Sequence, residues 1–140
     1  MNPFRRILLG TGCLPDELRG EVMADGVLLL EEGLRGSVTY RHYRAPGRRA
    51  NWSKSGLYTA LAVTSARVVV ASGRGKTVDC PRDQDGLEVS TDGPDRLLLV
   101  FDAAKLSPER SGRVAVRLRL PNAQRAVVAT GKPSTTLNGV

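Results

Sequence analysis

The sequence predicts a mainly β fold, an antiparallel barrel or sandwich of about seven to eight strands with a short N-terminal helix and a short C-terminal helix. Three observations lead to this prediction. Apolar and polar residues alternate over much of the chain, which is the period of half-buried strands. The 15 glycines and 8 prolines supply the turns that short strands need. Helical periodicity is confined to one segment near each end of the chain.

The length and composition indicate a single globular domain. A chain of 140 residues lies within the usual size of one domain, and a hydrophobic content of 41% is enough to form a core. We expect a flexible N-terminal segment over residues 1–13, one domain over 14–131 and a disordered tail over 132–140. The apolar runs are too short to cross a bilayer, so no transmembrane segment is predicted.

The first element is a helix predicted over residues 14–25. Pro15 suits the first helical turn, and the acidic residues Asp16 and Glu17 lie near the positive end of the helix dipole. Gly26 supplies a stop signal. The apolar residues repeat at a spacing of four: Leu14, Leu18 and Val22. This spacing predicts one narrow buried face.

Beyond Gly26 the hydrophobic period changes to two. Strands are predicted over 27–31 and 37–44, with a turn over 33–36 between them. The segment 45–55 is basic and rich in turn residues, and it is predicted to be a loop. Alternation in the second strand assigns its side chains to two faces, with Val38, Tyr40 and His42 on one and Thr39, Arg41 and Tyr43 on the other.

The middle of the chain predicts a series of short strands. Residues 57–64 and 67–72 form a hairpin across the two-residue connection Ser65-Ala66. Further strands follow at 77–80, which Pro81 ends, and at 87–91 and 96–102, with turns over 83–86 and 92–95.

The last predicted strand, 113–120, alternates strictly. Val114, Val116, Leu118 and Leu120 face one way, and Arg113, Ala115, Arg117 and Arg119 face the other. This pattern predicts a half-buried strand with a solvated basic face. A short helix over 123–130 follows, with Asn122 as its N-cap and Gly131 as its stop.

The order of these elements resembles the pleckstrin-homology-like superfamily in its GRAM-like or bacterial PH-like form. The resemblance rests on the segment GLYTALAVTSARVVVAS over 56–72, in which Leu61, Val63 and Thr64 are followed after two residues by Arg67 and three valines. It covers residues 26–130 and implies a barrel with a C-terminal helix across one end. Phosphoinositide-binding members carry Lys and Arg along the first hairpin loop. Residues 31–36 include two acids and one base instead, so inositol-phosphate binding there is not expected.

Basic residues are concentrated in two blocks. Residues 37–76 carry eight Lys or Arg and no acid, and residues 110–140 carry six and no acid. Such blocks attract phosphate-bearing partners, unless they neutralise the acidic segments 1–36 and 77–109 within the fold. The candidate partner-binding residues are Arg44, Arg48, Arg49, Trp52 and Lys54 in the first block and Arg113, Arg117 and Arg119 in the second.

Two interpretations are open for Trp52, and two are open for the arginines over 113–119. Trp52, among cations in its predicted loop, is either exposed at a partner or membrane interface or folded back beneath the loop. The arginine stripe over 113–119 either extends a basic surface or pairs with the acids of 77–109 on a neighbouring strand, which stabilises little at an exposed site.

No motif predicts catalysis, and no cofactor or metal is expected. The single histidine, His42, is interpreted as a core or rim residue. Residues 73–77 end like a phosphate-binding loop but lack its first glycine and the helix that must follow. Cys13 and Cys80 are not in a CxxC pair, so a zinc site is not predicted and both are interpreted as reduced thiols.

These observations predict a non-catalytic interaction or regulatory module that binds a protein partner or self-associates. The alternative is a module that binds anionic lipid or a membrane surface through the basic segment around Trp52. Nucleic acid is not the expected partner, because no RNP, KH or helix-turn-helix signature is visible. We expect a cytoplasmic location, peripheral to the membrane under the alternative, because the apolar stretch after Arg6 is shorter than the roughly 7–15 residues of an export signal.

Overall fold

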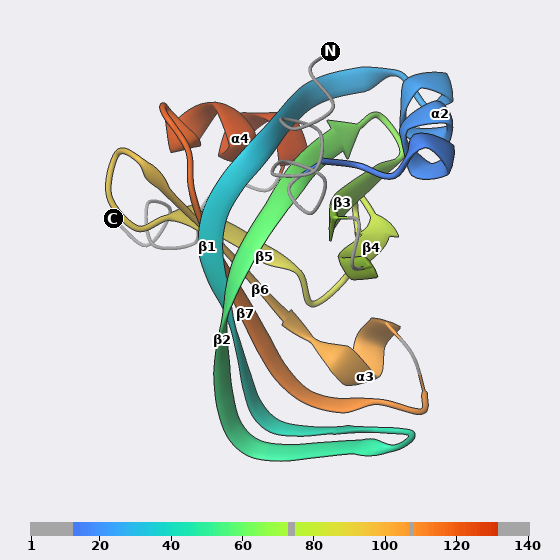
Figure 1. Ribbon diagram of the computed structural model, residues 1–140, viewed down its shortest axis with the longest axis vertical. Helices are drawn as coiled ribbons and strands as arrows, with labels where there is room; N and C mark the ends of the chain where they lie inside the picture. Colours follow the sequence, from blue (N-terminus) through green and yellow to red (C-terminus); the bar gives the residue numbers. More distant parts are fainter. Residues whose placement is uncertain (1–12, 73–74, 107, 132–140) are drawn as a thin grey trace, which may run out of the picture.

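The computed structural model of the chain describes residues 13–72, 75–106 and 108–131 (Figure 1). Seven antiparallel strands form one sheet in the order β4-β3-β2-β1-β7-β6-β5. The sheet curls into a half-barrel, which confirms the predicted mainly β fold with a short helix toward each end. The elements are α2 (Asp16–Ala24), β1 (Val27–Ala45), β2 (Arg48–Thr64), β3 (Arg67–Ser72), β4 (Gly75–Pro81), β5 (Glu88–Thr91), β6 (Arg96–Asp102), α3 (Ala103–Leu106), β7 (Ser111–Arg119) and α4 (Ala123–Thr130). The segments 1–12 and 132–140, which include most of the predicted flexible terminus and the whole predicted tail, lie outside the described residues.

One long hairpin, β1–β2, replaces several of the predicted elements. The predicted turn over 33–36 is wrong, because β1 runs through it with a register shift between Glu31 and Leu34. Gly33, with φ +71°, lies at this irregularity, so the glycine serves a bulge and not a reversal. The predicted loop over 45–55 is also wrong, since only Pro46-Gly47 separates the strands. Its polar character reflects strand ends at which most side chains are exposed.

The core lies on the concave side of the sheet. Alternate residues of the strands converge there, and the largest fully buried side chains include Leu61, Leu97, Leu99 and Leu118. Helix α4 packs against β1, β2, β5 and β6, and its small residues Ala123, Ala126 and Val127 join the same core cluster. Gly131 ends α4 with φ +70°, as predicted. Asn122 occupies the N-cap position, as predicted, but it has φ +54° and its side chain makes no capping hydrogen bond.

Helix α2 packs on the outer side of β2 and β3. Its predicted stripe is confirmed: Leu14, Leu18 and Val22 form a second buried cluster with Ala60, Ala62, Val69 and Ala71. Three of these four strand residues are alanines, so the helix can approach the sheet closely. Leu61 and Val63, the alternate residues of β2, point into the main core. The alternation of alanine with larger residues in 60–63 thus reflects two different packing partners.

A bend near His42 changes the faces predicted for the end of β1. The pairing of β1 with β7 shifts by one residue between Arg41 and Arg44, and His42 has φ +52°. Consequently Tyr43 is only 7% exposed and joins the core, whereas His42 is exposed, so the predicted faces of both are wrong. Opposite the bend, a Cβ at Gly112 would lie 2.5 Å from the His42 carbonyl oxygen. In Figure 1 the end of the hairpin turns sharply beneath the rest of the sheet.

Candidate functional site

The outer surface of the half-barrel carries arginines in register across neighbouring strands. Residues directly opposite each other in antiparallel strands project from the same face of the sheet. Two such rows cross β2, β1, β7 and β6 in that order. The distal row consists of Trp52, Arg41, Arg113 and Asp102. The proximal row consists of Tyr58, Arg35, Arg119 and Arg96. Lys54 and Arg117 lie between the rows. We call the seven cations of this surface the outer basic face: Arg35, Arg41, Lys54, Arg96, Arg113, Arg117 and Arg119.

Like charges face each other within these rows. Arg41 is opposite Arg113, and Arg119 stands between Arg35 and Arg96. All five side chains are exposed. Like charges directly opposite each other in a sheet are destabilising. The fold therefore maintains a concentration of positive charge that its own sheet does not favour.

Carboxylates compensate this charge only at the margin. The closest approaches are 3.9 Å from Arg113 to Glu88, 3.9 Å from Arg117 to Asp92 and 3.8 Å from Arg119 to Asp95. The arginine stripe thus both extends a basic surface and meets acids, so each of its two interpretations holds in part. Exposed pairs at these distances contribute about 0–1 kcal/mol. Within the described ranges, no ion pair involves Arg35, Arg41 or Arg96.

The two aromatic residues of these rows lie on β2. Trp52 is 61% exposed and opposite Arg41, so the structure selects the exposed alternative over the folded-back one. Tyr58 is half-buried opposite Arg35, and its hydroxyl would lie 3.4 Å from a Cβ at Gly33. Each row therefore begins with an aromatic ring on β2 and continues with arginines on β1 and β7, and the distal row ends at Asp102 on β6.

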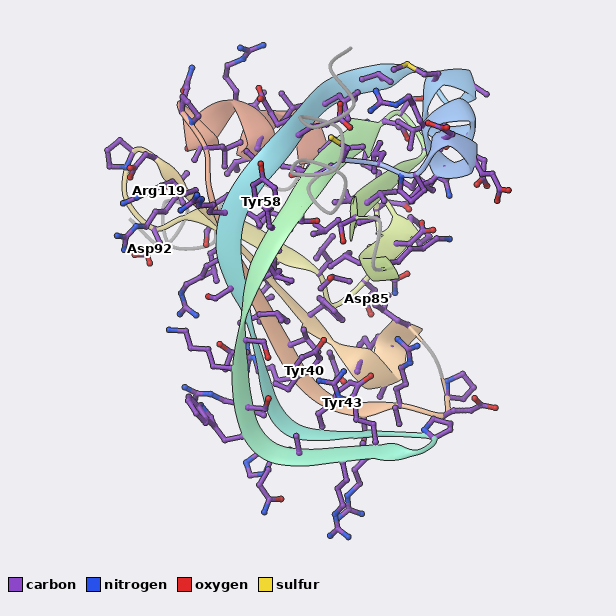
Figure 2. The ribbon with its side chains drawn as sticks, in the orientation of Figure 1. Tyr40, Tyr43, Tyr58, Asp85, Asp92 and Arg119 are labelled. Atoms are coloured by element: carbon purple, nitrogen blue, oxygen red, sulfur yellow. The ribbon has the colours of Figure 1, made fainter. Side chains whose placement is uncertain are left out.

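The remaining predicted cations, Arg44, Arg48 and Arg49, lie at the end of the hairpin and project to different sides of the sheet. Ala45 packs toward the core and is opposite Arg48, so that pair projects inward. The guanidinium of Arg48 lies 4.5 Å from the ring centre of Tyr40 and 5.8 Å from that of Tyr43. Figure 2 shows both tyrosines on the concave side, away from Arg119. Arg48 is exposed, but its cation–π contacts direct it toward the concave side, away from the outer basic face.

Arg44 and Arg49 are opposite each other and both exposed. They alternate with the inward pair, so they project to the outer side at the tip of the hairpin. The structure thus brings together Trp52, Lys54, Arg113, Arg117 and Arg119, and it places Arg44 and Arg49 beyond the distal row. Sequence reasoning missed Arg35, Arg41, Tyr58 and Arg96. The available signal was alternation alone, which assigns a face but does not show that β1 pairs with β7.

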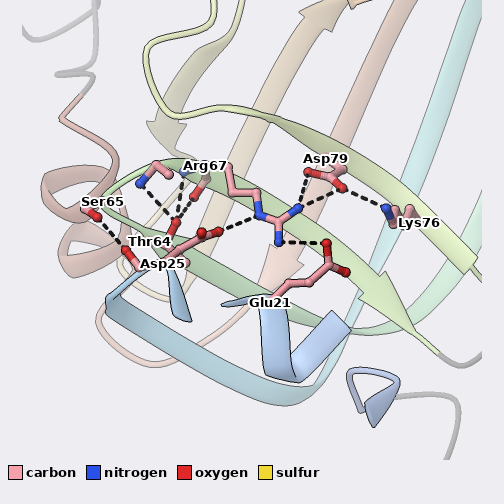
Figure 3. Close-up of polar contacts among 8 residues, drawn as sticks. Glu21, Asp25, Thr64, Ser65, Arg67, Lys76 and Asp79 are labelled. Atoms are coloured by element: carbon pink, nitrogen blue, oxygen red, sulfur yellow. Dashed lines mark hydrogen bonds and ion pairs between the residues drawn. The ribbon is translucent and has the colours of Figure 1, made fainter. Parts of the chain in front are cut away.

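Many acidic residues are engaged elsewhere in the fold. Arg67 joins α2 to β3 and β4: its guanidinium lies 2.8 Å from Asp25, 3.4 Å from Asp79 and 3.7 Å from Glu21 (Figure 3). Asp79 also accepts a hydrogen bond from Lys76 at 2.9 Å. Burial lowers the pKa of Arg67, but the carboxylates of Asp79, Asp25 and Glu21 outweigh it, so its pKa is raised. This cluster is a structural tie between elements, and its acids are not available to the outer basic face.

A second tie connects the start of α2 to β1. The Glu32 carboxylate accepts hydrogen bonds from the Arg19 guanidinium and, at 2.9 Å, from the Leu14 backbone N–H. Burial raises the pKa of Glu32, but these bonds and the charge of Arg19 outweigh it, so the pKa is lowered. Burial, followed by the charge of Glu32, raises the pKa of the nearby Cys13 thiol. Cys13 and Cys80 are not joined in a disulfide bond.

The structure offers little support for other chemistry. Within the described ranges, no three His, Cys, Asp or Glu side chains are grouped so that they could hold a metal ion. Gly73 and Arg74, the start of the loop that resembles a phosphate-binding motif, lie outside the described residues. In the part of the chain that is described, no helix has the length and apolar character needed to span a membrane.

Comparison with known proteins adds no family to this description. No protein-family model, curated protein or solved structure matches the chain. The function is therefore inferred from the outer basic face and its aromatic residues.

Proposed function

We propose that the chain is a non-catalytic interaction module that binds an anionic partner through the outer basic face, on a scaffold of the pleckstrin-homology-like type. The observation that supports this most directly is the set of opposed arginines. Arg41 faces Arg113, and Arg35 and Arg96 flank Arg119, and among the residues that the structure describes no carboxylate comes closer than 3.8 Å to any of the five. An array of carboxylates or phosphates would relieve this repulsion on binding.

The residue type supports the same proposal. The guanidinium of arginine presents a planar set of donors that matches carboxylate and phosphate groups in a bidentate manner. Six of the seven cations of the outer basic face are arginines. Self-association through this face would place arginines against arginines, because a two-fold contact uses the same surface on both copies. A partner that carries negative charge therefore fits this face better than a second copy of the chain bound through the same face.

A membrane surface with anionic lipids is the second candidate. Trp52 is 61% exposed, and Arg44 and Arg49 project from the outer side of the same hairpin. Tryptophan favours the interfacial region of a bilayer, and each cation near an anionic surface contributes about 1 kcal/mol. The tip of the hairpin would be the contact in this case.

The substitution Arg119→Glu tests the proposed function. It changes the proximal row from three cations to an alternating Arg–Glu–Arg row, so the fold is expected to stay intact while anion binding weakens. The measurement is the salt concentration needed to elute the protein from an immobilised polyanion such as heparin. Arg119→Glu should elute at clearly lower salt than the wild type.

Arg125→Glu is the matched control, because it makes the same change of net charge on an exposed residue of α4. It should elute close to the wild type. Equal effects of the two substitutions would show that net charge alone governs retention and would contradict the proposal. Vesicles containing phosphatidylserine test the second candidate, which requires co-sedimentation that depends on Trp52.

A further inference from the structure

The aromatic residues and arginines of the outer face form a repeated unit. In the distal row Trp52 is opposite Arg41, and in the proximal row Tyr58 is opposite Arg35. In both rows a further arginine follows on β7, Arg113 or Arg119. The unit is therefore a ring on β2 beside two cations on the adjoining strands, and it occurs twice on one face.

We propose that the anionic partner is single-stranded nucleic acid, with bases stacked on Trp52 and Tyr58 and phosphates paired with the adjoining arginines. This inference rests on the proposed function. Unpaired bases offer flat faces to aromatic side chains, and the backbone supplies a phosphate for each nucleotide. An acidic protein surface could also use a Trp or Tyr as an anchor, but single-stranded nucleic acid supplies a flat base and a phosphate in each repeating unit, which match the ring and the arginines of each row. A duplex keeps its bases stacked on one another and leaves the rings without partners.

The distance between the two units suits a chain of several nucleotides. Trp52 and Tyr58 are six positions apart on β2, which corresponds to roughly 20 Å at about 3.3 Å per residue. Lys54 and Arg117 lie between the rows, so positive charge continues from one unit to the other. The surface is the convex side of a curled sheet (Figure 2). A flexible strand can follow such a surface, whereas a planar bilayer would touch only part of it.

The sequence alone predicts that nucleic acid is not the partner, because it contains no visible nucleic-acid-binding signature. The signatures considered belong to RNP, KH and helix-turn-helix proteins and describe local segments. The face described here is assembled from strands distant in the chain, since Arg35 meets Arg119 only through the pairing of β1 with β7. No local motif would reveal it.

The position of the single tryptophan makes a direct measurement feasible. The chain has one Trp, so its fluorescence reports on the distal row alone. The full-length protein is titrated with oligothymidylate of about 16 nucleotides, a length at the upper end of known site sizes for one sheet-based module. A stacked base should quench the emission of Trp52. Log affinity should fall with log salt by roughly 0.7 for each phosphate contacted.

Variants separate stacking from charge. Trp52→Ala should weaken oligothymidylate binding by roughly 5- to 150-fold, because stacking on one ring contributes that range, while Trp52→Phe should retain most of the affinity. Arg41→Gln should weaken binding and reduce the salt slope by about 0.7. Val128→Ala, which shortens an exposed apolar residue of α4, is the control and should leave binding unchanged. Far-UV circular dichroism verifies that each variant is folded.

Each outcome decides the inference. Loss of binding in Trp52→Ala together with quenching supports it. If Arg119→Glu abolishes binding while Trp52→Ala does not, the face binds polyanions by charge alone, which overturns the nucleic-acid inference and leaves the proposed function standing. The inference is also overturned if the protein binds phosphatidylserine vesicles or polyglutamate more strongly than oligothymidylate, and the Trp52 emission shifts to the blue or does not change instead of being quenched. If no variant of the outer face alters the binding of any polyanion, the proposed function fails as well.

Discussion

The guanidinium of Arg67 reaches three carboxylates from two elements, and its side chain is 19% exposed. Arg67→Ala should lower the free energy of unfolding by about 1.5–3 kcal/mol, because hydrogen bonds to charged groups contribute in this range. Urea unfolding followed by circular dichroism measures the change. Arg125→Ala, at an exposed position of α4, should stay within about 0.5 kcal/mol of the wild type. Equal stability of Arg67→Ala and the wild type would show that the cluster does not hold α2 in place.

Glu32 gives the stability a defined dependence on pH. Its pKa in the folded chain lies below the ordinary value of 4.5, so its ionised form is the stabilising one. The contribution is complete above 4.5, the value in the unfolded chain, and disappears as the pH falls through the lowered folded value. Glu32→Gln should therefore be less stable than the wild type at neutral pH, and the difference should shrink at acid pH.

Urea midpoints of the two proteins, measured from neutral pH through and below 4.5, test this expectation. Glu17→Gln, an exposed position of α2, is the matched control for loss of one carboxylate. A difference between Glu32→Gln and the wild type that stays constant over the whole range would contradict the role given to the ionised carboxylate.

At the scale of elements, the close approach of β1 to β7 depends on Gly36. A Cβ at this position would lie 1.9 Å from the Arg117 carbonyl oxygen. Gly36→Ala should therefore destabilise the fold by about 1–3 kcal/mol, as overpacking does, because the two strands must separate. Gly20→Ala is the contrasting variant, since nothing lies within 4 Å of a Cβ there. It should stabilise α2 by about 0.5–1 kcal/mol. Thermal unfolding of both variants should show shifts of opposite sign.

The elements also show what the sequence could predict. Helix α2, β3, β6, β7 and α4 were predictable because each has a consistent period and clear boundary residues. The hairpin β1–β2 was not, since Gly33 lies at a bulge where local patterns suggest a turn, and the polar strand ends resemble a loop. Only tertiary pairing distinguishes these alternatives. The same reason explains the site: the Arg113 stripe was visible in the sequence, whereas its neighbours Arg41 and Arg35 depend on register.

For the whole molecule, the outer basic face implies a conflict between stability and binding. Arg41→Thr should raise the free energy of unfolding by about 0.2–1 kcal/mol, because it removes the repulsion with Arg113 and places a strand-favouring residue in β1. The same variant should bind polyanions less tightly. Lys54→Thr is the control, since Lys54 is opposite Thr39 and gains the strand preference without relieving a like charge. If Arg41→Thr gains no more stability than Lys54→Thr, the opposed arginines do not repel appreciably.

The position of β1 in the sheet order also has a consequence for synthesis on the ribosome. β1 lies between β2, its immediate successor in the chain, and β7, which begins only at Ser111. As the chain emerges, the β1–β2 hairpin forms early and keeps one long edge open until β7 arrives. Charged side chains along an open edge hinder pairing with other chains. Arg35, Arg41 and Arg44 occupy that edge, so replacing all three with neutral residues should cause the protein to aggregate during expression, whatever the stability of the finished fold.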